Sequence, residues 1–199
     1  MQAVIVRHSE CSLNGFGSAE NRRIFFQPVC RFLIVMDMEQ LVTRDGLSAL
    51  GARYAAEGKN LVLTNGCFDL LHTGHVRYLQ QARELGDVLI VAVNSDQSVR
   101  ALKGPERPLN SALDRAEVLA GLRCVDHVTV FEGKRVTDVI RQLRPAIYAK
   151  GGDYTLETLD PEEREALQDV GTEIRLLSLV PGKSTTSLLE RAKSTQAVP

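Results

Sequence analysis

Residues 61–75 read LVLTNGCFDLLHTGH, and this stretch decides the fold class of the chain. It opens with an apolar run over residues 61–65 that lacks alternation, which predicts a strand buried on both faces. It closes at the start of a helix predicted over residues 75–85, with Gly86 after the helix end. A buried strand followed directly by a helix is the repeating unit of an α/β sheet.

The same alternation continues along the rest of the chain. Further strands are predicted over residues 88–93, 127–131, 146–149 and 174–179, and further helices over residues 41–57, 111–122, 136–143, 161–170 and 184–193. Because strand and helix alternate throughout, we predict an α/β, Rossmann-like, doubly wound parallel sheet of five strands with helices on both faces. Residues 38–199 are predicted to form this one domain.

Residues 1–37 differ from the domain that follows them. They mix glycine, serine, asparagine and arginine with two apolar clusters and show no sustained period. Three interpretations stay open: an upstream start codon that adds a segment with no folding role, a regulatory arm, or an extra strand.

Composition excludes several functional classes. The formal net charge of the 199 residues is -1, so no global attraction to nucleic acid or to an anionic membrane is indicated. The four cysteines form no C-x-x-C pair, which favours a reduced cytoplasmic protein over a disulfide framework. No apolar run approaches the ~20 residues that span a bilayer. We therefore expect a cytoplasmic protein that binds neither nucleic acid nor membrane.

The junction after the first strand carries the clearest chemistry. It is neither a dinucleotide fingerprint nor a P-loop, but His72 and His75 bracket Gly74 at a helix start. That spacing puts both imidazoles beside the free N–H groups of the first turn, which suits a polyphosphate whose charge shifts during reaction. A helix cap or surface role is the alternative for either histidine. A metal site lacks a third ligand, since Asp69 is as readily a turn residue.

Two motifs in the right order resemble those of a known family. Residues 72–75 match the H-x-G-H signature of the cytidylyltransferase-like nucleotidyltransferase superfamily, and residues 64–75 resemble its opening block. Residues 182–186 (GKSTT) resemble its second signature, a Ser-Thr pair at the start of a late helix. The two signatures together are far more specific than either alone.

Six further segments narrow the resemblance. Residues 94–96, 102–104, 107–108, 114–115, 150–154 and 181–186 are similar to the adenylyltransferase domain of ADP-heptose synthases, which make ADP-D-glycero-β-D-manno-heptose for lipopolysaccharide core. The resemblance covers about residues 39–193. Many relatives fuse this domain behind a sugar kinase, so a separate kinase is expected to supply the sugar phosphate here. Cytidylyltransferases carry Arg where this chain has Leu179, which favours ATP over CTP.

The resemblance implies transfer of AMP from ATP to D-glycero-β-D-manno-heptose 1-phosphate, with Mg²⁺ on the phosphates. The catalytic residues it implies are His72, His75 and Lys103. The nucleotide-binding residues are Thr64, Asn65, Gly66, Phe68, Gly74, Lys150, Gly151, Ser184, Thr185 and Thr186. The substrate-binding residues are Asp69, Asp96, Arg115 and Asp153.

Two other functional classes remain open from the sequence. One is a related nucleotidyltransferase acting on glycerol 3-phosphate, ethanolamine phosphate or FMN. The other is a nucleotide-binding regulator that has lost turnover, against which the intact histidine and Ser-Thr pairs argue. We also expect the protein to form a homo-oligomer.

Overall fold

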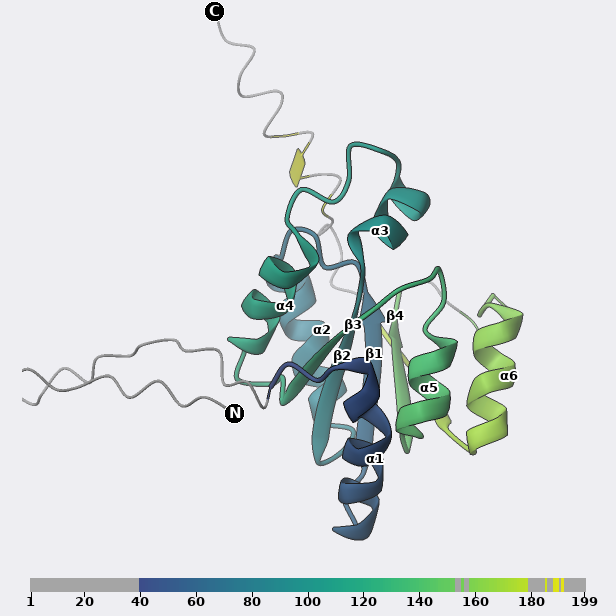
Figure 1. Ribbon diagram of the computed structural model, residues 1–199. Coiled ribbons are helices and arrows are strands. Elements are labelled where there is room, and N and C mark those ends of the chain that lie inside the picture. Colours follow the sequence, from purple (N-terminus) through teal and green to yellow (C-terminus); the bar gives the residue numbers. More distant parts are fainter. Residues whose placement is uncertain are drawn as a thin grey trace, which may run out of the picture. The chain divides into compact units, whose positions relative to one another are not determined.

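The computed structural model describes residues 40–152, 155, 158–178, 185, 188, 189 and 191. The predictions for residues 1–37, for Leu179 and for most of the helix over 184–193 lie outside them. The described elements are a 3₁₀ helix (Arg44–Gly46), α1 (Leu47–Ala56), β1 (Leu61–Gly66), α2 (Thr73–Arg83), β2 (Val88–Asn94), α3 (Asp96–Lys103), α4 (Ala112–Ala120), β3 (His127–Phe131), α5 (Thr137–Leu143), β4 (Ile147–Gly151), α6 (Pro161–Val170) and β5 (Glu173–Leu177) (Figure 1).

The sheet confirms the predicted fold class. Its strands are parallel in the order β3-β2-β1-β4-β5. The chain moves outward from β1 through β2 to β3, then returns to the other side of β1 to form β4 and β5. The winding direction therefore reverses between β1 and β4, where Leu63 pairs with Tyr148. In such sheets the crevice at the carboxyl ends of these two strands is where ligands bind.

The central strands are buried because helices cover both faces. Along β2, Ile90 and Ala92 face the core that contains α1, α5 and α6, whereas Leu89 and Val91 face the core that contains α2 and α4 (Figure 1). All four side chains are fully buried. The absence of polar alternation in residues 88–93 thus reflects a strand enclosed on both sides.

Two element predictions were wrong in informative ways. The helix predicted over 41–57 begins at Leu47, because Leu41 forms a parallel bridge with Val128 of β3 and Val42 donates its N–H to the Val128 carbonyl at 2.8 Å. α3 was not predicted at all, although Ser95 caps it by accepting from the Ser98 N–H. The sequence analysis assigned no element to these eight residues, which follow β2 directly.

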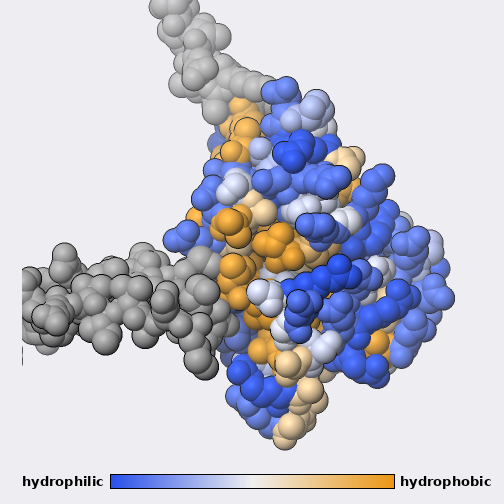
Figure 2. All heavy atoms as spheres, in the orientation of Figure 1, coloured by the Kyte–Doolittle hydropathy of each residue, from blue (hydrophilic) through white to orange (hydrophobic). Residues whose placement is uncertain are grey.

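The surface divides into a hydrophilic and a more apolar part. On the face in Figure 2, hydrophilic residues predominate over α5 and α6, and hydrophobic residues gather around α4. Leu113 and Val118 of α4 are exposed, as is Leu109 in the preceding loop. Among the described residues, no helix has the length and apolar character needed to cross a membrane.

Candidate active site

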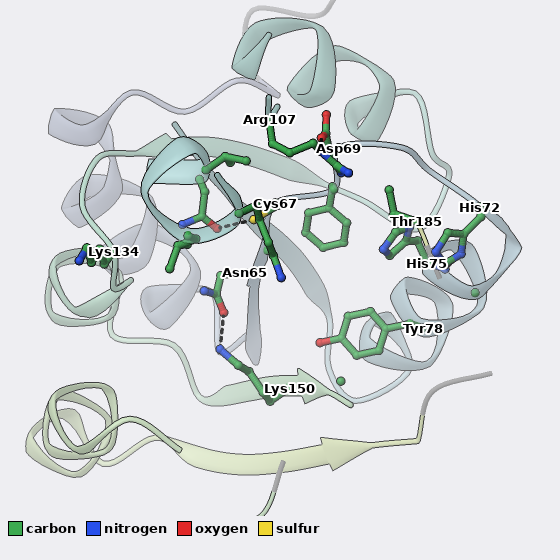
Figure 3. Close-up of a pocket in the computed structure, with 18 of the residues that line it drawn as sticks. Asn65, Cys67, Asp69, His72, His75, Tyr78, Arg107, Lys134, Lys150 and Thr185 are labelled. Atoms are coloured by element: carbon green, nitrogen blue, oxygen red, sulfur yellow. Dashed lines mark hydrogen bonds and ion pairs between the residues drawn. The ribbon is translucent and has the colours of Figure 1, made fainter. Parts of the chain in front are cut away.

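A cavity of about 530 Å³ opens at the carboxyl ends of β1, β2 and β4 (Figure 3). The start of α2, the end of α3 and the loop before α5 complete its walls. Eleven of the residues proposed from sequence line it, namely Asn65, Gly66, Phe68, Asp69, His72, Gly74, His75, Lys103, Lys150, Gly151 and Thr185. The topology therefore brings the first signature, one residue of the second and both predicted lysines to one place.

The two histidines form a stacked pair at the start of α2. Their ring centroids are 3.9 Å apart with an interplanar angle of 20°. His72 is also the N-cap of α2, because its Nδ1 accepts a hydrogen bond from the His75 backbone N–H at 3.4 Å. In the neutral ring this acceptor role leaves the proton on Nε2. His72 therefore caps the helix, as the alternative interpretation proposed, and it also lines the cavity.

The environment of His75 keeps its ring neutral. Burial, together with the adjacent His72, lowers the pKa of His75 to about 4. Its Nδ1 is buried and has no hydrogen-bond partner among the described residues. The Leu70 backbone acts on the pKa in the opposite direction, since a hydrogen bond with it raises the pKa of His75. Phe68 contacts the ring edge-on with centroids 5.4 Å apart, and holds this position with a φ of 46°. A backbone strained in this way is typical of functional sites.

Asp69, a predicted substrate-binding residue, lines the cavity, and its carboxylate has several partners within the protein. Its carboxylate is 2% exposed and is occupied by the loop of residues 104–111. Arg107 donates to Oδ2 at 2.5 Å, and the backbone N–H groups of Leu109 and Asn110 donate to Oδ1 at 2.7 and 3.2 Å. Asp69 therefore anchors the loop that forms one wall of the cavity.

Arg115 and Asp96, two further predicted substrate-binding residues, do not line the cavity. Arg115 is 2% exposed and donates to the backbone carbonyls of three strand-end and loop residues, Cys67, Asn94 and Asn110. It also pairs with Asp96 at 2.8 Å. Most of the guanidinium donors are used in this way. Arg115 is thus tied to Asp96 and to the strand ends that border the cavity, and the substrate-binding role of the two residues stays a prediction.

Lys150 lies at the end of β4 in a polar cluster. Its Nζ contacts Asn65 Oδ1 at 3.1 Å, the Tyr148 hydroxyl at 3.0 Å and Glu163 Oε2 at 3.2 Å. Sequence reasoning missed Glu163, although a signal existed. Glu163 occupies the same face of α6 as the buried residues Ala166 and Leu167, and a charged residue in an apolar stripe calls for a partner.

Thr64 is a scaffold residue rather than part of the cavity wall. It is fully buried, and its hydroxyl lies 2.6 Å from the hydroxyl of Tyr78, which itself donates to the Ala149 carbonyl. Burial raises the pKa of Tyr78 to about 12. The ring of Tyr78 packs so closely on β4 that a Cβ at Gly151 would lie 2.6 Å from it. Gly151 therefore serves this packing as well as lining the cavity.

Cations that sequence reasoning did not assign complete the wall. Lys134 and Arg135, in the loop between β3 and α5, line the cavity together with Arg107. Arg135 pairs with Asp160 at 2.7 Å. Glycine at position 133, whose φ is 98°, was the available signal of a tight turn at a strand end.

Cys67 lines the cavity, and burial raises the pKa of its thiol, which agrees with a packing role.

The second signature is described only at Thr185. This residue is helical, and its hydroxyl donates to the Leu70 carbonyl at 3.4 Å, which ties it to the loop before α2. Ser184, Thr186 and Asp153 lie outside the described residues.

Comparison with known proteins shows the family to which the chain belongs. The sequence profile of the family described as cytidylyltransferase-like matches residues 63–194. The chain is 50% identical over 152 residues to the bifunctional protein HldE of Pelobacter propionicus, covering 76% of this chain and 31% of that protein. It is 48% identical over 147 residues to the bifunctional protein HldE of Geobacter sulfurreducens, covering 74% and 30% respectively.

A solved structure shares the fold. The lipopolysaccharide core biosynthesis protein from Thermoplasma volcanium GSS1 is 25% identical, with a TM-score of 0.52, over 62% of this chain and 98% of that one. The chain spans about a third of the length of the HldE relatives, so only their matching part bears on the cavity described above.

Proposed function

Because this chain belongs to the cytidylyltransferase-like family of nucleotidyltransferases, we propose that it transfers AMP from ATP to D-glycero-β-D-manno-heptose 1-phosphate. The products are ADP-heptose and pyrophosphate. The identity of about half the residues with the matching part of two HldE proteins supports the sugar substrate. The observation that carries the proposal is the stacked His72–His75 pair in one cavity with Lys103 and Lys150.

The reaction is an in-line displacement at the α-phosphorus of ATP. An oxygen of the sugar 1-phosphate forms the new P–O bond, and the bond to the bridging oxygen of pyrophosphate breaks. A phosphate nucleophile is largely ionised at neutral pH, so the reaction needs no strong general base. Catalysis then consists mainly of positioning and of stabilising the charge on the transferred and leaving phosphates.

His72 and His75 supply donors to that charge. The cap gives the neutral His72 ring its N–H on Nε2, and the His75 ring stacks on it at the cavity. A neutral imidazole donates one hydrogen bond without adding a full charge, and negative phosphate nearby favours its protonated form. Lys103 and Lys134, which also line the cavity, add positive charge that suits phosphate groups.

Mg²⁺ fits this site as part of the substrate MgATP. Within the described part of the chain, no group of three or more His, Cys, Asp and Glu side chains is placed to hold a metal ion. Mg²⁺ is commonly held through substrate phosphates and water with one or two carboxylates. When bound, the ion would neutralise phosphate charge. Asp96 is our candidate for holding substrate hydroxyls or orienting the cation, and Asp153 is a candidate for a contact with sugar hydroxyls.

The biological setting follows from the substrate. A sugar kinase, on a separate chain or domain, must supply the heptose 1-phosphate, and the nucleotide chemistry belongs to the cytoplasm. We also propose that the enzyme forms a homo-oligomer.

A pyrophosphate-release assay tests the substrate assignment. We expect kcat/KM to be highest for heptose 1-phosphate with ATP, compared with glycerol 3-phosphate, ethanolamine phosphate and FMN, each with ATP and with CTP. Sites that pair with substrate hydroxyls reject analogues that lack them, because buried polar groups are then left unpaired. A preference for glycerol 3-phosphate with CTP would contradict the heptose assignment. ATP binding without any pyrophosphate release would indicate a nucleotide-binding regulator.

A further inference from the structure

The carboxylate of Glu163 is buried at the cavity wall. Glu163 lines the cavity, yet its side chain is only 4% exposed. It occupies the third position of α6, where its own backbone N–H is capped by Asp160 and where the helix dipole favours negative charge. Burial of a carboxylate is unfavourable unless specific partners compensate it. The role of the Glu163 carboxylate can therefore be inferred from the groups that it contacts.

Lys150 is that partner, and its hydrogen bonds are directed inward. An ammonium group has three protons, and three oxygens surround Nζ: those of Glu163 at 3.2 Å, Tyr148 at 3.0 Å and Asn65 at 3.1 Å. Glu163 also lies 3.3 Å from the Tyr148 hydroxyl. These three contacts fix the position of Lys150 in the wall of the cavity.

The cluster determines how the amide of Asn65 is turned. Asn65 Oδ1 accepts from Lys150 and, at 2.7 Å, from the Tyr148 hydroxyl. With its oxygen facing these two donors, the amide nitrogen lies on the side away from Lys150 (Figure 3). No hydrogen bond from this nitrogen is found within the described residues, and Asn65 lines the cavity. Its two N–H donors are therefore available to a ligand at the end of β1.

We propose that Glu163 is a positioning residue, which holds Lys150 so that Lys150 and Tyr148 keep the Asn65 amide donors directed at the bound nucleotide. The inference rests on the proposed function only in taking a nucleotide as the occupant of the cavity. It assigns to Glu163 a role that acts through Lys150 and Asn65.

The direction in which ATP affinity changes in Glu163→Gln distinguishes a positioning role of Glu163 from a purely electrostatic one. Glu163→Gln removes a negative charge beside a site for a polyanion, so electrostatics alone would tighten ATP binding. Positioning predicts the opposite, because Lys150 loses its fixed partner and the Asn65 amide loses its orientation. We expect Glu163→Gln to weaken ATP binding by about tenfold, the effect of one hydrogen bond to a charged group.

Calorimetric titration with ATP, in the absence of sugar phosphate, gives the dissociation constants. The matched control is Glu162→Gln, which removes an exposed carboxylate from the same helical turn and should leave the affinity unchanged. Asn65→Ala should weaken binding by about tenfold as well. Because both residues act through the same amide, the double variant should bind no more weakly than Asn65→Ala.

Tighter or unchanged ATP binding in Glu163→Gln, or a double variant about a hundredfold weaker than the parent, would overturn the inference. Should Glu163→Gln not fold, Tyr148→Phe carries the test, since it removes one donor to Asn65 and keeps the ring in the core. We expect it to weaken ATP binding, and an unchanged affinity would again overturn the inference. A parent protein that shows this pattern without turning over heptose 1-phosphate would refute the proposed function alone.

Discussion

The ring of His75 combines two environments. One nitrogen is buried beside Phe68, and the ring stacks on His72 at the cavity. Such a ring cannot turn freely, so the donor that reaches the phosphates is preorganised. A donor of this kind acts most strongly where charge develops in the transition state.

We therefore expect His75→Ala to lower kcat by about 10²-fold and to change ATP affinity much less. His75→Gln, whose amide nitrogen can replace Nε2 as the donor, should retain more activity than His75→Ala. Steady-state kinetics with calorimetry checks both points. Near-normal kcat in His75→Ala would contradict the role given to the pair.

The low pKa of His75 also makes stability depend on pH. In the unfolded chain the group has its ordinary pKa of 6.5, and in the folded protein the pKa is about 4, so the unfolded state binds more protons between these values. The free energy of unfolding should therefore fall as pH drops from about 6.5 toward 4. Melting temperatures across this window should decline less in His75→Gln. Parallel curves for both proteins would show that His75 does not titrate as described.

At the level of helices, strands and loops, two buried charged residues fix the loops next to the cavity. Asp69 holds the loop between α3 and α4, and Arg115 of α4 binds the carbonyls at the ends of β1 and β2. Asp69 lines the cavity as well as holding the loop, whereas Arg115 is buried and does not line it. Substitution of Asp69 should therefore disturb the loop that forms part of the cavity wall.

Asp69→Asn should raise the KM for the sugar phosphate by about tenfold, because a neutral amide cannot accept from Arg107 and two backbone donors equally well. ATP affinity should change little, since the histidine pair is anchored separately. Glu106→Gln, an exposed change in the same loop, is the control and should leave both constants unchanged. Equal losses of ATP and sugar-phosphate affinity would argue that Asp69 supports the whole cavity instead.

At the scale of the whole molecule, the sheet extends beyond its five strands. The Val128 N–H donates to the Gln40 carbonyl at 2.8 Å, and its carbonyl accepts from Val42. Residues 40–42 therefore belong to the fold, whereas every predicted motif lies beyond residue 37.

A protein that starts at Met38 should consequently keep the melting temperature and the turnover of the full chain. One that starts at Arg44 should lose roughly 2 kcal/mol of unfolding free energy, because the buried N–H and C=O of Val128 lose their partners. Denaturant unfolding of the two proteins measures the difference. Loss of folding already at Met38 would show that residues 1–37 are needed.

Some site residues could be predicted from the sequence because their arrangement depends on short-range patterns. His72, His75 and Gly74 lie within one turn of helix, so their spacing alone implied a shared position. Thr64 and Arg115 were equally visible as residues of a resemblance, but their contacts involve Tyr78 and the backbone of Cys67, Asn94 and Asn110. No local pattern distinguishes a lining cation from one that is buried behind the lining.

Local patterns were sufficient to predict the α/β class, the parallel sheet and the histidine pair, because apolar runs, caps and helix-start motifs act over a few residues. Which charges face the cavity could be seen only in the folded chain. That choice depends on the reversal between β1 and β4, which brings Asn65 next to Lys150 across 85 positions, and on α6, which brings Glu163 to the same wall. A buried charge is stabilised by whichever partner packing supplies, and such partners are distant in sequence.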